Sequence, residues 1–193
     1  MLLGVLALTL VYLVGSIPFG LIVGKLRGVD VRRLGSGNIG ATNVSRALGL
    51  RWAALVLFLD AAKGGLAVLA MGMLFSDHPA QDRWIALAMI SAVSGHIYPI
   101  FLSFNGGKGV ATTLGVTLVG CPPAALVGVA GYGLGLLLTR TSAVGSLAGV
   151  GLALLWLWLG PAPRAIAIAF TAISALILLH HRDNIRSLAD RKK

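Results

Sequence analysis

Charged side chains are scarce in this sequence. Only 11% of the 193 residues are Asp, Glu, Lys or Arg, whereas soluble domains contain about 25%. The acidic residues are six Asp with no Glu, too few for a site in which carboxylates hold two metal ions. The one cysteine, Cys121, cannot form a disulfide within the chain, and no Cys or His cluster has metal-ligand spacing. The composition therefore argues against an ordinary soluble domain and predicts no metal site.

Apolar residues, in contrast, make up 57% of the chain and lie in runs of about 20 residues, the length that crosses a bilayer. The strict alternation typical of membrane barrels is missing from the sequence. We therefore expect an all-α polytopic integral membrane protein, with residues 1–193 forming one transmembrane domain. The net charge of +10 fits anionic lipid headgroups and anionic substrates better than nucleic acid.

The apolar pattern predicts seven transmembrane helices. The stretch 110–139 is too long for one span, and Pro122 and Pro123 interrupt it, because the residue before a proline is pushed out of helical geometry. We expect two short helices there, and a kink at Pro18 inside the first helix. Polar connections are expected at 27–49 and from residue 181 onward. The expected helices are 2–26, 50–75, 84–104, 110–120, 123–139, 143–159 and 164–180.

The cations support this count of helices. With seven helices, 13 of the 16 Lys and Arg residues fall on one side, in the loop 25–51, at Lys108 and Arg140, and in the tail. A single helix over 110–139 would move the tail to the opposite side and end this segregation. The positive-inside rule makes the cationic side cytoplasmic, with the N-terminus outside and the C-terminus in the cytoplasm.

Two short runs of glycine and small polar residues, Gly35–Asn43 and Asn105–Thr113, lie in these cytoplasmic connections. Successive backbone N–H groups in a glycine-rich turn can surround an anion, and a following helix N-terminus adds its dipole. Close helix packing would also account for the glycines, but not for a lysine or two threonines. We therefore predict a phosphate site in the second run, at Gly106, Gly107, Lys108, Gly109, Thr112 and Thr113.

Neither run is a nucleotide-binding motif. The pattern Gly35-x-Gly37-x-x-Gly40 matches the dinucleotide fingerprint as letters, but the strand–helix–strand context of that fingerprint is missing. In the second run, Leu102 stands where a Walker motif needs glycine, and a glycine follows Lys108 in place of Ser or Thr. The two runs therefore argue against a Rossmann dinucleotide site and against a nucleotide triphosphatase motif.

Ionisable residues inside the predicted helices are costly and are usually paired or functional. Asp60 and Lys63 lie on one helix face, so they could form an ion pair, or Lys63 could hold a substrate phosphate. His96 could be a structural hydrogen-bond donor or a base. After the last helix, interfacial anchoring explains the arginines of a polar cluster better than it explains the amide and imidazoles. That cluster contains His180, His181, Arg182, Asn184 and Arg186.

These motifs, in this order, resemble the bacterial acyl-phosphate:glycerol-3-phosphate acyltransferases, the PlsY family. The resemblance covers essentially the whole chain. The His-x-x-x-x-Asp motif of the other glycerol-phosphate acyltransferases does not occur in the sequence. The matching stretches are Gly35 to Arg46, Asp60-x-x-Lys63-Gly64, Gly95-His96 to Thr112, and His181-Arg182-x-Asn184-Ile185-x-x-Leu188.

The resemblance implies a seven-helix enzyme of the bacterial inner membrane whose site faces the cytoplasm and uses no acyl-CoA, cofactor or metal. It would transfer a fatty acyl group from acyl phosphate to the 1-hydroxyl of sn-glycerol 3-phosphate. The products would be lysophosphatidate and phosphate, in the first acylation of phospholipid synthesis. Its partners would be both substrates, membrane lipids and the soluble enzyme that makes acyl phosphate, but no nucleic acid.

The same resemblance assigns the candidate residues. The catalytic ones would be Ser36, Lys108, His181 and Asn184. The substrate-binding ones would be Asn38, Thr42, Asn43, Arg46, Lys63, His96, Gly106, Gly107, Gly109, Thr112, Thr113, Arg140, Ser146 and Arg182. The hydroxyl proton would pass either to the donor phosphate or to His181 as general base. The competing function is a membrane transporter of a phosphorylated metabolite, and a purely structural protein would leave the glycine-rich runs unexplained.

Overall fold

The computed structural model describes residues 1–190, and the cations Arg191, Lys192 and Lys193 counted above lie outside the described residues. Over residues 1–190 the chain is helical and contains no strand, which confirms the all-α expectation. The elements are α1 Leu2–Gly15, α2 Phe19–Leu26, the 3₁₀ helix η1 Val31–Arg33, α3 Ala41–Leu48, α4 Leu50–Leu74, α5 Gln81–Ile97, the 3₁₀ helix η2 Ile100–Leu102, α6 Val110–Gly120, α7 Pro122–Thr139, α8 Ser142–Leu159, α9 Arg164–His180 and α10 Arg182–Asp190.

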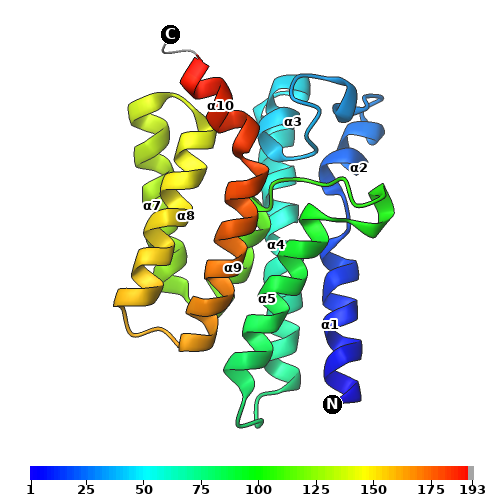
Figure 1. Ribbon diagram of the computed structural model, residues 1–193. Coiled ribbons are helices and arrows are strands. Elements are labelled where there is room, and N and C mark those ends of the chain that lie inside the picture. The colour runs from blue at the N-terminus through cyan, green and yellow to red at the C-terminus, as the bar shows by residue number, and fades with distance from the viewer. Residues whose placement is uncertain (191–193) are drawn as a thin grey trace.

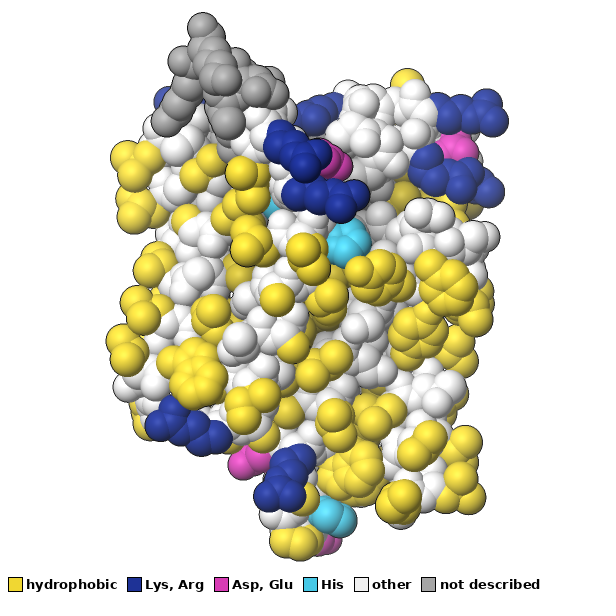
Figure 2. Space-filling view, viewed as in Figure 1, with side chains coloured by type: hydrophobic (Ala, Val, Ile, Leu, Met, Phe, Trp, Pro, Cys, Tyr) yellow, Lys and Arg dark blue, Asp and Glu magenta, His cyan; other side chains and the backbone are white. Residues whose placement is uncertain are grey.

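The long helices run roughly parallel to one another, and the start of α1 and the helix α10 lie at opposite ends of the bundle (Figure 1). The short helices α2, α3 and α10 gather at one end, which we call the α3–α10 end. Figure 2 shows apolar side chains covering the middle of the visible face, while Lys and Arg gather at the two ends, mostly at the α3–α10 end. Such a belt between polar ends is the surface that a bilayer covers.

Length and hydropathy identify five segments that could cross a membrane, and α6 and α9 are apolar but shorter. The five are Leu2–Leu26, Leu50–Leu74, Gln81–Leu102, Pro122–Thr139 and Ser142–Leu159.

Two prolines shape the path of the chain, one more strongly than the sequence predicts. At Pro18 the expected kink is a complete break, because α1 ends at Gly15 and α2 begins at Phe19. Proline has no N–H to continue the helical ladder. The stretch 110–139 is interrupted at Cys121 and Pro122, which confirms that it forms two helices.

Two expectations about the connections were wrong, and the tail, for which no secondary structure was predicted, is helical. The connection 27–49 contains the helix α3, which buries Val44 against Val31 and Val56 in a small apolar cluster. The polar tail forms the helix α10. The helix α5 ends at Ile97 and not at residue 104, because Pro99 disfavours helical geometry at the residue before it.

Glycines bring the backbones of neighbouring helices into contact. A Cβ built on Gly115 of α6 would lie 1.9 Å from the carbonyl oxygen of Ala61 on α4. A Cβ on Gly149 of α8 would lie 2.5 Å from the carbonyl oxygen of Gly128 on α7. Membrane helices lack a hydrophobic driving force between them, so this close packing is a main source of their association.

We therefore expect Gly115→Ala to lower the thermal unfolding temperature in detergent, because overpacking costs about 1–3 kcal/mol. The matched control is Gly133→Ala on α7, where nothing lies within 4 Å of the added Cβ. The control should be neutral or slightly stabilising, since alanine favours helix over glycine by about 1 kcal/mol. Equal unfolding temperatures for the two variants would contradict the packing argument.

Candidate active site

Two adjoining cavities lie at the α3–α10 end. A polar cavity of about 690 Å³ is lined by residues from the first glycine-rich run, the second run and α10. A second cavity of about 470 Å³ continues inward among α4, α6, α7 and α8. The two are parts of one site, because they share lining residues from all three sequence regions. The shared residues include Ser36, Asn38, Arg46, Lys108 and Asn184.

The inner cavity lies beside the short helix α6, which lines it from Val110 to Thr117. The 11 residues of α6 span about 16 Å, roughly half the thickness of the hydrocarbon core. The N-terminal turn of α6 therefore lies below the α3–α10 end. Gly109, Val110 and Thr113 from this turn line the inner cavity.

The first glycine-rich run is held in shape by Asn43, which is buried at the start of α3. Its side-chain oxygen accepts from the backbone N–H of Ser36 at 2.9 Å, and its NH₂ donates to the carbonyls of Val31 and Leu34 at 2.8 and 3.0 Å. Gly35 has a φ of +55°, and a Cβ there would lie 2.4 Å from the Asn43 oxygen. The Asn43 amide is thus used by the loop itself, while no side-chain hydrogen bond occupies the Ser36 hydroxyl within the described residues.

The second run is tied to the end of α5. The N–H groups of Gly106 and Gly107 donate to the carbonyls of Ile97 and His96, each at 3.1 Å. A Cβ on Gly107 would lie 2.1 Å from His96 Nε2, so only glycine fits against the imidazole. These two N–H groups are already bonded and are therefore not the anion donors that the sequence predicted.

The free donors belong instead to the first turn of α6. Gly109, with a φ of +83°, turns the chain so that the helix begins at Val110. The N–H groups of a first helical turn have no intrahelical partner. Within the described residues, the buried Oγ1 atom of Thr113, which lines the inner cavity, also has no hydrogen-bond partner. The turn thus presents unpaired donors to the cavity, and its helix dipole favours an anion.

Lys108 adds a full positive charge beside this turn. Its ammonium donates to the side-chain oxygen of Asn184 on α10, 76 positions later in the chain. Burial lowers the pKa of Lys108, the charge of Asp183 opposes this shift, and the guanidinium of Arg46 adds to it.

His181 lies at the junction of α9 and α10 and is 3% exposed. Its Nδ1 lies 2.8 Å from the carbonyl oxygen of Ile177, so Nδ1 carries the proton and Nε2 is left as an acceptor. Burial lowers the pKa of His181, and the nearby charges of Lys108 and His180 act in the same direction, although the bond to Ile177 opposes them. The imidazole is therefore kept in its neutral form.

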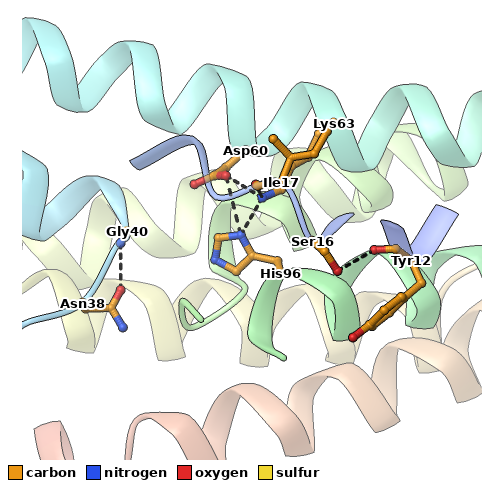
Figure 3. Close-up of polar contacts among 8 residues, drawn as sticks. All are labelled: Tyr12, Ser16, Ile17, Asn38, Gly40, Asp60, Lys63 and His96. Atoms are coloured by element: carbon orange, nitrogen blue, oxygen red, sulfur yellow. Dashed lines mark hydrogen bonds and ion pairs between the residues drawn. The ribbon is translucent and has the colours of Figure 1, made fainter. Parts of the chain in front are cut away.

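A buried cluster of polar side chains, drawn in Figure 3, joins α4 to α5 beside the inner cavity. The ammonium of Lys63 lies 2.7 Å from Asp60 Oδ1 and donates to the carbonyl oxygen of Ile17 at 2.7 Å. It also lies 3.0 Å from Nδ1 of His96. The ion pair proposed from the sequence is therefore present, and its ammonium also bonds to the carbonyl next to the Pro18 break. Lys63 itself does not line either cavity, whereas Asp60 and His96 line the inner one.

Comparison with known proteins identifies the chain. A family model described as glycerol-3-phosphate acyltransferase matches residues 5–191. The chain belongs to this family. The resemblance seen in the sequence motifs is thereby confirmed, as is the expectation of an acyltransferase.

The relatives are glycerol-3-phosphate acyltransferases of similar length. The protein of Anaeromyxobacter sp. (strain K) is 48% identical over 189 residues, which cover 97% of this chain and 94% of the relative. That of Myxococcus xanthus is 48% identical over 181 residues, covering 93% of each. Crystal structures of PlsY, an integral membrane glycerol 3-phosphate acyltransferase, superpose with TM-scores of 0.91 and 0.90 at 37% and 36% identity. They cover 98% of this chain and 94% and 93% of PlsY, in its glycerol 3-phosphate and lysophosphatidic acid forms.

Most of the predicted acyltransferase residues meet in the two cavities, and three do not line either one. Lys63 is buried in the ion pair, Thr112 is buried against Gly64, and the exposed Arg182 lies 3.9 Å from Asp183. The residues that line the cavities are Ser36, Asn38, Thr42, Asn43, Arg46, His96, Gly106, Gly107, Lys108, Gly109, Thr113, Arg140, Ser146, His181 and Asn184.

Sequence reasoning missed Tyr132 and Ser142, which line the inner cavity. The Ser142 hydroxyl lies 3.1 Å from that of Thr42 and 3.2 Å from that of Tyr132, so it joins α3 to α7 and α8 across the cavity. A single tyrosine among glycines and leucines gives no sequence signal of this kind. Asp183 was also missed, although it stands beside a predicted site residue.

The charge near Lys108 gives a testable pH effect. Asp183→Asn removes the carboxylate that supports the protonated ammonium, so the pKa of Lys108 should fall further. Activity that needs the protonated Lys108 ammonium would then be lost at a lower pH in the variant than in the wild type. The alkaline limb of the kcat/KM profile should shift to lower pH. Asp77→Asn, in the exposed connection at the opposite end, is the control and should leave that limb in place.

Proposed function

We propose that this chain transfers a fatty acyl group from acyl phosphate to the 1-hydroxyl of sn-glycerol 3-phosphate. The hydroxyl oxygen bonds to the acyl carbon, the bond from that carbon to the phosphate oxygen breaks, and lysophosphatidate and inorganic phosphate are released. Because acyl phosphate is already activated, the enzyme can work by positioning and by stabilising charge.

The observation that carries this proposal is the continuity of the two cavities. The outer cavity is polar, with the cations Arg46 and Lys108 on its wall. The inner cavity continues past the free first turn of α6 to apolar side chains such as Leu114, Val129 and Phe170. A phosphorylated headgroup fits the first environment and an acyl chain fits the second, so one molecule of acyl phosphate would lie across both.

The roles follow from this placement. The first turn of α6, with Thr113 and Lys108, binds the donor phosphate. Ser36, Arg46 and Asn184 bind glycerol 3-phosphate at the outer cavity. Asn38 is suited to the same task because its oxygen accepts from Gly40 N–H at 2.8 Å, which leaves its NH₂ group for a ligand. The other lining residues complete the wall.

The site faces the cytoplasm of a bacterial inner membrane in this proposal. Support comes from the positive-inside rule, because the cations gather at the α3–α10 end (Figure 2). The chain crosses seven times if α1 with α2 counts as one span and the shorter α6 and α9 are included, so the N-terminus is outside. The same cationic end is the surface on which a soluble enzyme could deliver acyl phosphate.

The proton of the acceptor hydroxyl goes to the donor phosphate. The neutral His181 orients the hydroxyl through its Nε2, whose acceptor character is fixed by the bond from Nδ1 to Ile177. The competing route, in which His181 takes the proton itself, uses the same atom and is tested below.

Turnover by purified protein in lipid or detergent tests the reaction. With palmitoyl phosphate and glycerol 3-phosphate, both lysophosphatidate and phosphate should form, while palmitoyl-CoA should give no product. Lys108→Ala should lower kcat/KM by at least about 100-fold, the loss typical of removing one donor to developing charge. Lys25→Ala, an exposed cation outside both cavities, should keep full activity. Binding of glycerol 3-phosphate without turnover, with uptake into vesicles, would favour a transporter.

His181→Gln separates the two proton routes. Glutamine places an amide near the position of Nε2 but is not a base, so kcat should stay within about tenfold of the wild type if the phosphate takes the proton. Loss of a general base would instead lower kcat by about 10²–10⁴-fold. It would also remove an acid limb of the pH profile, because protonation below the lowered pKa of His181 abolishes its basicity.

A further inference from the structure

We propose that His96 is a further catalytic residue, whose Nε2–H donates to the carbonyl oxygen of the acyl donor. Lys63 is its positioning residue and fixes the imidazole in the tautomer that can donate. This inference rests on the proposed function, since it assigns a role within that reaction.

The cluster is buried inside the bundle beside the inner cavity, with Asp60, Lys63 and His96 only 1%, 5% and 3% exposed. The Lys63 ammonium donates to the Ile17 carbonyl at 2.7 Å and lies 3.0 Å from His96 Nδ1, and it forms an ion pair with Asp60 Oδ1 at 2.7 Å. An ammonium has no lone pair, so it can only donate to Nδ1. His96 Nδ1 therefore carries no hydrogen.

The alternative arrangement, in which Nδ1–H donates to Asp60, does not fit the distances. His96 Nδ1 lies 3.6 Å from Asp60 Oδ1, which is too long for a hydrogen bond. The neutral imidazole must then carry its hydrogen on Nε2. A bond from a cation to Nδ1 also withdraws electron density from the ring, which makes Nε2–H a stronger donor.

This donor faces the cavity. In Figure 3, Nε2 lies on the side of the ring away from the ion pair, and His96 lines the inner cavity. No hydrogen bond to Nε2 is formed by the described residues. Against it lies Gly107, directly before Lys108 and the first turn of α6. A donor phosphate held by that turn would have its acyl carbonyl at the start of the apolar part of the cavity, beside His96.

The reaction needs a donor at this place. As the acceptor oxygen adds to the acyl carbon, the carbonyl oxygen gains negative charge, and the Nε2–H bond stabilises it. When the carbon–oxygen bond to phosphate breaks, the electron pair and charge leave with the phosphate, which takes the hydroxyl proton. His96 neither gains nor loses a proton. Neutral imidazole held as an electrophile by a neighbouring positive end is a known device in enzyme catalysis.

The tautomer can be measured without turnover. In protein labelled with ¹⁵N-histidine, the His96 signals, assigned from their loss in His96→Asn, should show the hydrogen on Nε2. His181 should show the opposite tautomer, with the hydrogen on Nδ1. A charged His96, or a hydrogen on its Nδ1, would overturn the proposal even if the enzyme is fully active with acyl phosphate.

Kinetics then test the role of the donor. Glutamine can place its NH₂ near the position of Nε2, whereas asparagine reaches only the position of Nδ1. We expect His96→Asn to lower kcat by about 10²–10³-fold with little change in KM for glycerol 3-phosphate, and His96→Gln to recover much of kcat. Lys63→Arg should retain more activity than Lys63→Met, because it keeps a cationic donor beside Nδ1.

Calorimetric binding of glycerol 3-phosphate shows that each variant is folded. A structural role for His96 predicts equal losses in both His96 variants, with weaker binding and a lower unfolding temperature. That pattern would overturn the assignment. Failure of the wild type to turn over acyl phosphate would instead reject the proposed function, and the tautomer measurement would still report on Lys63 and His96.

Discussion

The site depends on one geometric constraint, which is the depth at which α6 begins. Bonds from Gly106 and Gly107 to the last carbonyls of α5 hold the preceding loop down inside the bundle. An 11-residue helix that starts there covers only about 16 Å. The inner cavity lies beside this helix from its first turn to Thr117, and the first turn carries unpaired N–H groups. A longer helix would carry its free donors to the surface.

The polar groups of the protein fall into two sets with different tasks. Asn43, Lys63 and the N–H groups of Gly106 and Gly107 are bonded within the chain and give the loops their shape. The first turn of α6, Lys108 and Nε2 of His181 face the cavity. An unpaired polar group costs several kcal/mol within a bilayer, so most polar groups are bonded within the chain. The loops that these bonds make rigid then hold the remaining polar groups in place at the cavity.

Local rules predicted the helices that prolines delimit. Pro18 and Pro122 interrupt helical geometry locally, and the apolar runs around them are long enough to recognise. The helices α3 and α10 were missed because their sequences are polar and short, and α3 is stabilised by burying Val44 against other segments. The glycine-rich runs were recognised as a site from the sequence. The sequence did not show that Asn43 supports the loop while the Ser36 hydroxyl stays free, because these roles depend on contacts between separate segments.

The sequence by itself determined the class of protein, the places where helices break, and the motifs that show the acyltransferase family. These depend on composition and on interactions between residues close in the chain. Tertiary structure decided which donors are free, because that depends on contacts over long separations: Lys108 with Asn184, Lys63 with His96, and Ser142 with Thr42. Spacing along the chain does not encode such contacts, since each arises only when separate helices pack at a given depth and rotation.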